Sequence, residues 1–387
     1  MNRFPFGFMR FWQIGLPLLI FSSCEQQKNE VVFDNSFLGA RLDSIVHQGA
    51  NKYMAYINPA FEPVNQSPWF AFGVTANAEM DIEVILNYGE YKHRYIPKLS
   101  ADRKSWKAIN DDRIKEDTIN GTALLSLKAS PEKLYVAAQE IESSEDTYRW
   151  LDGIMHKHHF LKKSVAGQTV LNNDNYVVST NDSLKKAIVL LARQHPPEIP
   201  GGTIGFKVFY EELLGNTQVA NDFREVFNIV AFPLVNPDGV DMGNWRHNAN
   251  GNDLNRDWIE FSQPETKTVK NYVENLKSNG VVIEFALDFH TSYNGPYLLV
   301  LDSINELKTK RIIPNWINRI ESNSEFKVEA RRRSQELPYC YNYFYNQIGC
   351  EAVTYEDGDE IDRAVIRERA RVYARELMET LLMTEAN

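Results

Sequence analysis

Four apolar runs of strand length lie in the second half of the chain, and segments of helical length separate them. The runs cover residues 186–194, 227–235, 282–290 and 350–356. The helices are expected at residues 145–161, 203–214, 262–278, 304–321 and 361–383. Strands that alternate with helices and are apolar on successive residues are typical of a mostly parallel sheet covered by helices on both faces. We therefore predict an α/β fold here.

Residues 31–140 show a different pattern, in which short strands follow one another without helices. Ile82, Val84 and Leu86 are apolar at every second position, and turn signals such as Asn-Tyr-Gly and Asn-Gly separate the runs. Several short strands with such turns predict a β-sandwich. The fold class expected for the whole chain is thus an N-terminal β-sandwich followed by a mixed, mostly parallel sheet, with the second domain spanning residues 141–387.

The N-terminus has the order of a secretory signal. The first ten residues carry two arginines and no acid, and the next thirteen are mostly apolar and too short to span a bilayer. Because Cys24 follows directly, residues 1–23 resemble a bacterial lipoprotein signal, with a lipid on the Cys24 sulfur and residues 24–30 as a tether. We expect an exported protein anchored to the cell envelope, on its periplasmic or cell-surface face. The alternative is ordinary cleavage and a soluble exported protein.

Composition excludes several classes. The 387 residues include 42 Lys and Arg against 52 Asp and Glu, a net charge of −10, so the basic excess of a nucleic-acid binder is missing and no nucleic-acid partner is expected. Hydrophobic residues at 43% and charged residues at 24% fit a globular protein and not a disordered or collagenous chain. The three cysteines are too few for a disulfide scaffold, and whether Cys340 and Cys350 pair is left open.

Polar side chains follow the predicted strands. His195 and Glu198 come after the first strand, His290 ends the third and Glu356 ends the fourth. The carboxyl ends of parallel strands meet at one edge of a sheet, so these side chains are expected to lie together. Two imidazoles and a carboxylate with one open position form a ligand set typical of catalytic zinc. Taken alone, His195-x-x-Glu198 could equally be a histidine at a sheet edge beside a charged turn.

The order of several motifs resembles the zinc metallocarboxypeptidases, the superfamily of the A and B carboxypeptidases and the cytosolic carboxypeptidases. The matching pieces are, in chain order, His195-x-x-Glu198, Asn236-Pro-Asp-Gly239, Trp245-Arg246, Asp253-x-Asn255-Arg256, His290 and Glu356. They lie within about residues 140–383. The segment before them is similar to the β-sandwich that precedes the catalytic domain in the cytosolic branch.

The resemblance implies roles for these residues. One Zn²⁺ per chain would be held by His195, Glu198 and His290, with a water as fourth ligand. Glu356 would be the general base, and Arg246 would polarise the scissile carbonyl. If the arrangement were not catalytic, Glu356 could instead form an ion pair with Arg246 or Arg193.

Three further residues follow from the same resemblance. Asn255 and Arg256 would bind the terminal carboxylate of the substrate, and Asp253 would accept a hydrogen bond from His195. Alone, Arg246 and Arg256 would be read as surface charges, and Asn236-Pro-Asp-Gly239 as mainly a turn.

Other features are less specific. Digestive carboxypeptidases use a tyrosine some twenty residues before the base, and none stands clearly there. The nearby candidates are Tyr339, Tyr341, Tyr343 and Tyr345. Two patterns are interpreted as helix ends: a capping box formed by Ser262 and Glu265, and acids at 357, 359 and 360 that satisfy the N-terminus of the last helix. His156, His158 and His159 are interpreted as a solvated helix face.

The function expected is hydrolysis of the C-terminal peptide bond of a peptide, or of an amide, that carries a free carboxylate. Two alternatives remain open. The first is an amidase or deacylase of the same fold that acts on cell-wall peptides or acyl amino acids. The second is a catalytically silent binding protein in which the β-sandwich is the working part.

Overall fold

The computed structural model describes residues 1, 30–302 and 311–386. The predicted signal segment, Cys24 and the tether up to residue 29 lie outside the described residues. So does the start of the helix expected at 304–321. Among the described helices, none is long and apolar enough to cross a membrane.

The N-terminal part of the described chain is a β-sandwich of two five-stranded sheets, with strand orders β1-β4-β10-β6-β7 and β2-β3-β5-β9-β8. The strands are β1 (Val31–Asp34), β2 (Ser44–His47), β3 (Lys52–Tyr56), β4 (Ala71–Ala76), β5 (Met80–Asn87), β6 (Lys98–Ser100), β7 (Lys107–Ala108), β8 (Ile114–Asp117), β9 (Thr122–Ala129) and β10 (Leu134–Ala137). Ile82 and Val84 of one sheet share a core with Phe72 and Val74 of the other. The sandwich is therefore present as predicted, while a domain boundary near residue 140 stays a prediction.

The second part is built on an eight-stranded sheet of order β11-β12-β14-β13-β15-β18-β16-β17. Its strands are β11 (Lys162–Gln168), β12 (Asp174–Ser179), β13 (Lys186–Ala192), β14 (Asn228–Phe232), β15 (Val282–Ser292), β16 (Tyr297–Leu301), β17 (Ala330–Arg333) and β18 (Glu351–Gly358). The four predicted runs are the central strands β14, β13, β15 and β18, which pair in parallel. The antiparallel pairs at β11, β12 and β16 make the sheet mixed.

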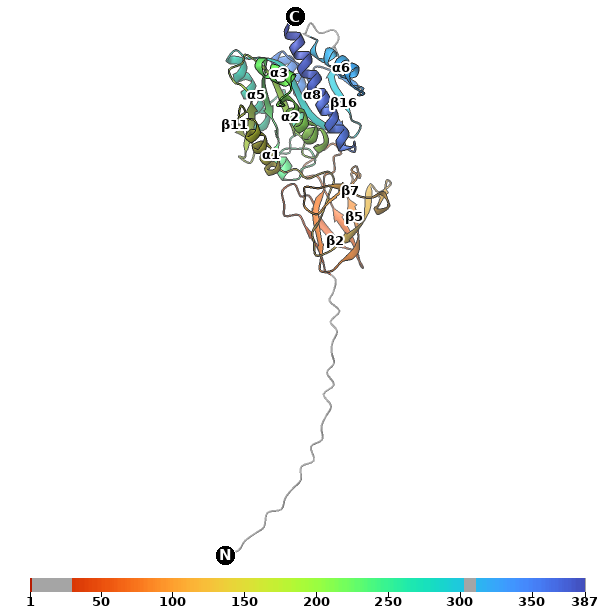
Figure 1. Ribbon diagram of the computed structural model, residues 1–387. Coiled ribbons are helices and arrows are strands. Elements are labelled where there is room, and N and C mark those ends of the chain that lie inside the picture. The colour runs from red at the N-terminus through yellow and green to blue at the C-terminus, as the bar shows by residue number, and fades with distance from the viewer. Residues whose placement is uncertain (2–29, 303–310, 387) are drawn as a thin grey trace.

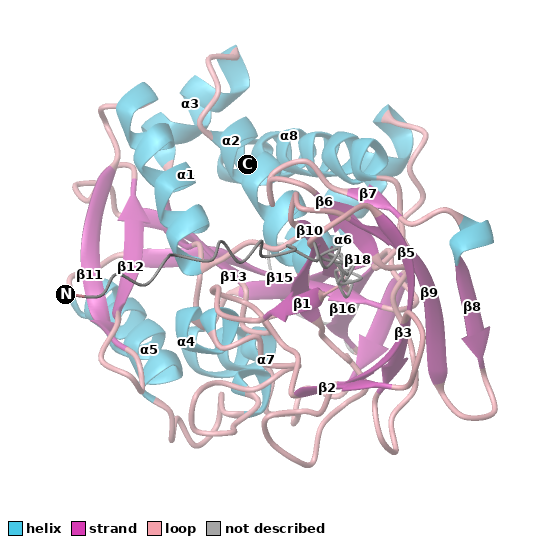
Figure 2. Cartoon of the chain, turned by 90° about the horizontal axis from the view of Figure 1, so that it is seen from below, coloured by secondary structure: helices cyan, strands magenta, loops and turns pink. Residues whose placement is uncertain are grey.

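Helices cover both faces of this sheet (Figure 2). They are α1 (Ser144–Lys157), α2 (Phe206–Leu213), α3 (Gln218–Val226), α4 (Pro237–Asp241), α5 (Pro264–Ser278), α6 (Ile312–Asn323), α7 (Cys340–Tyr343) and α8 (Arg363–Ala386). Along β13, Ile188 and Leu190 pack against the core beneath α2 and α8, while Val189 and Leu191 pack on the side of α5 and α7. Successive side chains of a strand point to opposite faces, so a strand covered on both is apolar throughout.

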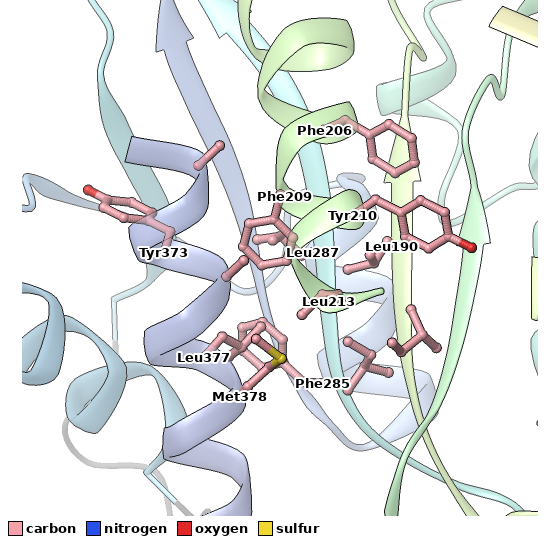
Figure 3. Close-up of a cluster of buried hydrophobic side chains, with 14 of the residues drawn as sticks. Leu190, Phe206, Phe209, Tyr210, Leu213, Phe285, Leu287, Tyr373, Leu377 and Met378 are labelled. Atoms are coloured by element: carbon pink, nitrogen blue, oxygen red, sulfur yellow. The ribbon is translucent and has the colours of Figure 1, made fainter. Parts of the chain in front are cut away.

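The larger core lies between the sheet and the helices α2 and α8 (Figure 3). Phe209 of α2 stacks edge-on against Phe289, with ring centroids 5.3 Å apart. Leu377 and Met378 of α8 close the same cluster over Phe285 of β15. The last helix of the chain is thus a central part of the core and not a peripheral addition.

The junction between the two parts is held by ion pairs next to the end of β18. Arg94 of the sandwich donates to both carboxylate oxygens of Asp359, at 2.7 and 3.1 Å, and Lys98 pairs with Glu360 at 2.7 Å. Figure 1 shows the N-terminal end of α8 beside β7. The interpretation of these acids as a helix N-terminus is therefore wrong, because Asp359 and Glu360 pair with cations of the sandwich. The third acid, Asp357, pairs with the side chain of Arg369 of α8.

The predicted capping box at the start of α5 is also wrong. The helix begins at Pro264, and Gln263 is its N-cap without a side-chain bond. Ser262 is bound elsewhere, because its amide and hydroxyl donate to Asp257 at 2.8 and 2.7 Å. The carboxylate of Glu265 accepts from Asn248 instead. Both residues of the predicted capping box are bonded to other parts of the fold instead.

We expect Phe209→Ala to lower the free energy of unfolding by about 3–5 kcal/mol, because it empties a fully buried ring site. Urea unfolding followed by tryptophan fluorescence measures this. Leu171, which is 54% exposed, offers the control, and Leu171→Ala should change stability by about 0.5 kcal/mol or less. Equal losses in the two variants would contradict the packing of Phe209 in the core.

Candidate metal centre and active site

The turn that carries His195 and Glu198 begins where β13 ends. Arg193 adopts a left-handed backbone conformation with φ 57°, which turns the chain out of the strand. Its buried guanidinium donates to the carbonyl of Pro196 at 2.9 Å and to Thr203 at 2.6 Å, and so holds the turn from behind. Arg193 is therefore bonded to the turn itself, and no ion pair joins it to Glu356 in the described chain.

A π-helical segment, Pro200–Gly205, follows this turn and packs against the end of β15. The amide of Gly201 donates to Thr291 at 2.8 Å. A Cβ atom at Gly201 would lie 1.8 Å from the carbonyl oxygen of His290. Only glycine fits here, and its absence of a side chain lets the His195 turn approach the strand that carries His290.

His290 and Glu356 are neighbours because their strands are. In the parallel pair of β15 and β18, His290 is in register with Glu356. On the other side, Tyr297 of β16 is in register with Glu356 in the antiparallel pair. Residues opposite one another in adjacent strands point to the same face, so Glu356 stands between the imidazole and the phenol.

The three predicted metal ligands come together and are buried. Nδ1 of His195 lies 2.8 Å from one carboxylate oxygen of Glu198, and Nδ1 of His290 lies 2.7 Å from the other. The two Nδ1 atoms are 3.1 Å apart. The main-chain amide of Thr291 also donates to Glu198, at 3.1 Å. In the part of the chain that the structure describes, this is the only group of three or more such side chains able to hold a metal.

Each imidazole is fixed at its other nitrogen by a buried carboxylate. Nε2 of His195 lies 2.9 Å from Asp253, and Nε2 of His290 lies 2.8 Å from Asp288. Nε2 is then the protonated donor, and both Nδ1 atoms present lone pairs. Two lone pairs 3.1 Å apart fit around one ion, since two nitrogens on tetrahedral zinc are about 3.3 Å apart. The residues therefore fit zinc.

Charges at the centre favour the charged form of both Glu198 and His290, which lowers the pKa of the first and raises that of the second. Burial would raise the pKa of Glu198, but the imidazoles of His195 and His290 hold it far below its usual range. Burial would likewise lower the pKa of His290, but Asp288 and Glu198 raise it well above its usual value. The carboxylates are thus stabilised in their ionised form and favour positive charge between them.

Glu356 is different, because no hydrogen bond to it is found among the described residues. The pKa of Glu356 is raised to about 8, mainly by burial and also by the charges of Glu198 and Asp288, while His290 and Arg246 oppose this rise. The side chain keeps some exposure to solvent. A half-buried carboxyl group with a raised pKa is suited to accepting and returning a proton.

Asp253 connects the metal centre to the predicted substrate side. One of its oxygens accepts from His195, and the other accepts from Nε of Arg246 at 2.6 Å. Burial would raise the pKa of Asp253, but His195 and Arg246 hold it well below its usual range. Arg246 is thus held by Asp253 and interacts with Glu356 through its charge alone.

Asn255 and Arg256 lie beside this network. Oδ1 of Asn255 accepts from the amide of Cys340 at 2.9 Å, and its Nδ2 lies 3.4 Å from Nε2 of His290. The guanidinium of Arg256 stands over the ring of Tyr339, 4.3 Å from its centroid, and its side chain is 40% exposed. Arg256 therefore has a free approach to solvent, while the Oδ1 atom of Asn255 is occupied by the amide of Cys340.

The Asn236-Pro-Asp-Gly239 motif is a turn with a structural task. Asn236 caps the short helix α4, and its Nδ2 donates to the carbonyls of Gln194 and His247 at 2.9 and 3.3 Å. A Cβ atom at Gly239 would lie 2.5 Å from the carbonyl oxygen of His247. The motif ties the His195 turn to the loop that carries Arg246.

Two residues near the centre were missed by the sequence reasoning. Asp288 lies two positions before His290 on the same strand, and this spacing was a usable signal because it places both on one face. Tyr297 could not be found from spacing, because its position opposite Glu356 depends on the antiparallel strand β16. Among the tyrosines considered, Tyr341 and Tyr343 are buried in the core and Tyr339 lies under Arg256.

Two further features of the sequence can now be placed. Cys340 and Cys350 are buried and form no disulfide, and Cys340 adjoins the centre because it contacts Asp288 and Asn255. His156 is exposed in the last turn of α1, and His159 is exposed just beyond the end of the helix, so both are solvated as predicted but do not share a helix face; their ring centroids are 6.2 Å apart.

Comparison with known proteins identifies the family and the fold. Residues 147–381 match the family described as zinc carboxypeptidase. The chain is 27% identical over 318 residues to cytosolic carboxypeptidase 3 from Mus musculus, over 73% of this chain and 31% of that protein. It is 24% identical over 306 residues to cytosolic carboxypeptidase 6 from Caenorhabditis elegans, over 72% and 66% of the two chains. It spans about a third of the length of the first of these relatives.

Solved structures share the fold. A metallo-carboxypeptidase from Burkholderia cenocepacia is similar with a TM-score of 0.75 and 19% identity, over 92% of this chain and 99% of that one. One from Pseudomonas aeruginosa, in complex with (2-guanidinoethylmercapto)succinic acid, has a TM-score of 0.73 and 18% identity, with the same coverage. A similarity over 92% of the chain includes the sandwich as well as the larger sheet.

We expect purified protein to hold about one zinc ion per chain and His290→Ala to lose it. Asp288→Asn should keep the ligands but weaken zinc affinity about 10–100-fold, because the carboxylate that orients His290 is gone. Competition with a chromogenic chelator measures both. The exposed Asp111 provides the control, and an equal weakening in Asp111→Asn would show that Asp288 has no specific part.

Proposed function

The chain belongs to the zinc carboxypeptidase family, and from this premise we propose that it is a zinc-dependent metallocarboxypeptidase. Its reaction would be hydrolysis of the C-terminal peptide bond of a peptide with a free carboxylate. The observation that carries the proposal is the placement of Glu356 in register with His290, beside His195 and Glu198. A base one strand away from a metal centre is what hydrolysis by an activated water requires.

The ligands of the zinc would be Nδ1 of His195, Nδ1 of His290 and the carboxylate of Glu198. When bound, zinc polarises a carbonyl and lowers the pKa of a water molecule. The task of the chain is to keep both imidazoles in one tautomer and orientation, and Asp253 and Asp288 do so.

Glu356 would take the proton of the attacking water and return it to the leaving amine. Its raised pKa makes it a stronger base than an exposed carboxylate. A bound divalent cation nearby lowers that pKa again, so that the group is ionised near neutral pH. The side chain has no competing hydrogen bond among the described residues and is free to turn between the two proton positions.

Arg246 would stabilise the negative charge that develops on the carbonyl oxygen. Its Nε is bound to Asp253, which fixes the plane of the guanidinium. Arg256 would bind the terminal carboxylate, since a planar guanidinium can donate two hydrogen bonds to it. Asn255 would add its remaining N–H. Removal of Arg256 should raise KM more than it lowers kcat.

We also propose that the protein is exported and held at the cell envelope by a lipid on Cys24. The support is the order of charged, apolar and small residues before that cysteine. In cells that make the full chain, the wild type should fractionate with membranes and incorporate labelled fatty acid. Cys24→Ser should abolish both, and incorporation that persists in this variant would contradict the proposal.

We expect Glu356→Gln to bind zinc normally and to lower kcat on a peptide with a free C-terminus by about 10²–10⁴-fold. Gln has nearly the same shape as Glu but cannot accept the proton. Release of the terminal amino acid, followed by mass spectrometry, measures the rate. Full activity in this variant would refute the assigned mechanism, and Glu132→Gln, an exposed change, should leave the rate unaltered.

The substrate panel decides between this proposal and its alternatives. It contains a peptide with a free C-terminus, the same peptide amidated, a cell-wall peptide and an acyl amino acid. Cleavage of the first and not the second supports a carboxypeptidase, because the clamp by Arg256 needs the carboxylate. Turnover of the cell-wall or acyl substrate alone would point to an amidase or deacylase. If zinc is bound but no substrate is turned over, the result would point to a binding protein.

A further inference from the structure

A cavity of about 580 Å³ lies at the junction of the sandwich and the second part, and Glu356 is not among its lining residues. We call it the junction cavity. Residues of the β6–β7 turn, the segment Glu140–Glu142, α1, the Pro200–Gly205 segment, α2 and α8 line it. Six of its lining side chains are cationic, namely Arg103, Lys104, Arg149, Lys207, Arg363 and Arg367, and only three are acidic. This local excess of positive charge stands against a net charge of −10 for the chain.

The three acids of the junction cavity are each taken by one cation. Glu142 pairs with Lys207, Asp146 pairs with Arg149 at 2.7 Å, and Glu140 pairs with Arg363 at 2.8 Å. Arg363 is saturated further by the carbonyls of Asp359 and Ile361. These pairs cancel one another and build the walls of the cavity.

Arg103, Lys104 and Arg367 are left over. In the described chain none of the three has a carboxylate within ion-pair distance. Arg103 is held over the rings of Phe37 and Tyr135, with its guanidinium carbon 5.3 and 5.4 Å from their centroids. All three are exposed at the rim, two from the sandwich and one from α8.

The walls around these cations are partly apolar. Ile199 and Ile204 are buried in the floor, and Trp106 is half-buried at the side. The indole N–H of Trp106 donates to the carbonyl of Arg103 at 3.1 Å, so its ring presents only carbon to the cavity. An occupant therefore meets positive charge at the mouth and an apolar surface behind it.

From this arrangement we propose that the junction cavity binds a small phosphorylated molecule with at least two negative charges. Three cations without partners match the charge of a phosphate monoester or diphosphate, and a guanidinium can donate two parallel bonds to phosphate oxygens. Because Arg103 and Lys104 come from the sandwich and Arg367 comes from α8, the ligand joins the two parts of the protein.

The junction cavity is connected to the metal centre through Arg193. Thr203 lines the cavity and accepts a hydrogen bond from Arg193, which also donates to the carbonyl of Glu142 and to that of Pro196, between the ligands His195 and Glu198. Ile199, which also lines the cavity, directly follows Glu198. A ligand that reaches these residues would contact the segment that positions two metal ligands, so its role would be regulatory.

The test is binding of inorganic pyrophosphate to the purified chain by isothermal titration calorimetry at constant ionic strength. We expect saturable binding to the wild type, and Arg103→Glu and Arg367→Glu each to weaken it about tenfold or more, since each reverses a charge at the mouth. Lys115→Glu, an exposed change elsewhere on the sandwich, is the control and should alter binding by about twofold or less.

Three results would overturn the proposal. They are no saturable binding to the wild type at about 10 mM pyrophosphate, equal weakening by Lys115→Glu and Arg103→Glu, and binding of citrate as tight as that of pyrophosphate. Because the titration needs no turnover, its outcome is independent of whether the peptidase activity is found. With zinc-loaded enzyme, pyrophosphate should also change the rate of zinc release to a chelator more in the wild type than in Arg367→Glu, since its direct binding of zinc is the same for both.

Discussion

The metal centre brings several carboxylates together in a buried place, and the surrounding structure has to compensate their negative charge. Glu198, Asp253, Asp288 and Glu356 all lie near the two histidines, and Arg246 is bound to Asp253. Burying carboxylates without compensation is costly, and the imidazoles and Arg246 stabilise the ionised forms of Glu198 and Asp253. A divalent ion held by the two Nδ1 atoms and Glu198 would add positive charge at the same place. The ligand geometry and the electrostatics therefore both favour a divalent cation at this place.

Much of this could be predicted from the sequence, because the signals were local. A strand covered on both faces must be apolar throughout, so the central strands β13 and β15 were visible as apolar runs. Polar residues directly after such strands have few structural reasons to be there. This is why His195, His290 and Glu356 can be recognised as candidate site residues from the sequence alone.

The rest depended on contacts that no local pattern reports. Ser262 and Glu265 have the spacing of a capping box, but Asp257 and Asn248 offer them better partners across the fold. The edge strand β11 and its neighbour β12 contain several polar residues, so their sequences lack the continuous apolar character of the centre. Tyr297 reaches Glu356 only because β16 pairs with β18.

The place of the last helix has a consequence for how the chain acquires its structure. Synthesis runs from the N-terminus, so the sandwich can fold while the rest is still being made. The larger sheet cannot, because β18 and α8 are its last elements and α8 supplies Tyr373, Leu377 and Met378 to the central core. The apolar strands of the sheet therefore stay exposed to solvent until the final turns of α8 have been synthesised. A truncation of even a few turns at the C-terminus would therefore leave a folded sandwich attached to an open, aggregation-prone sheet.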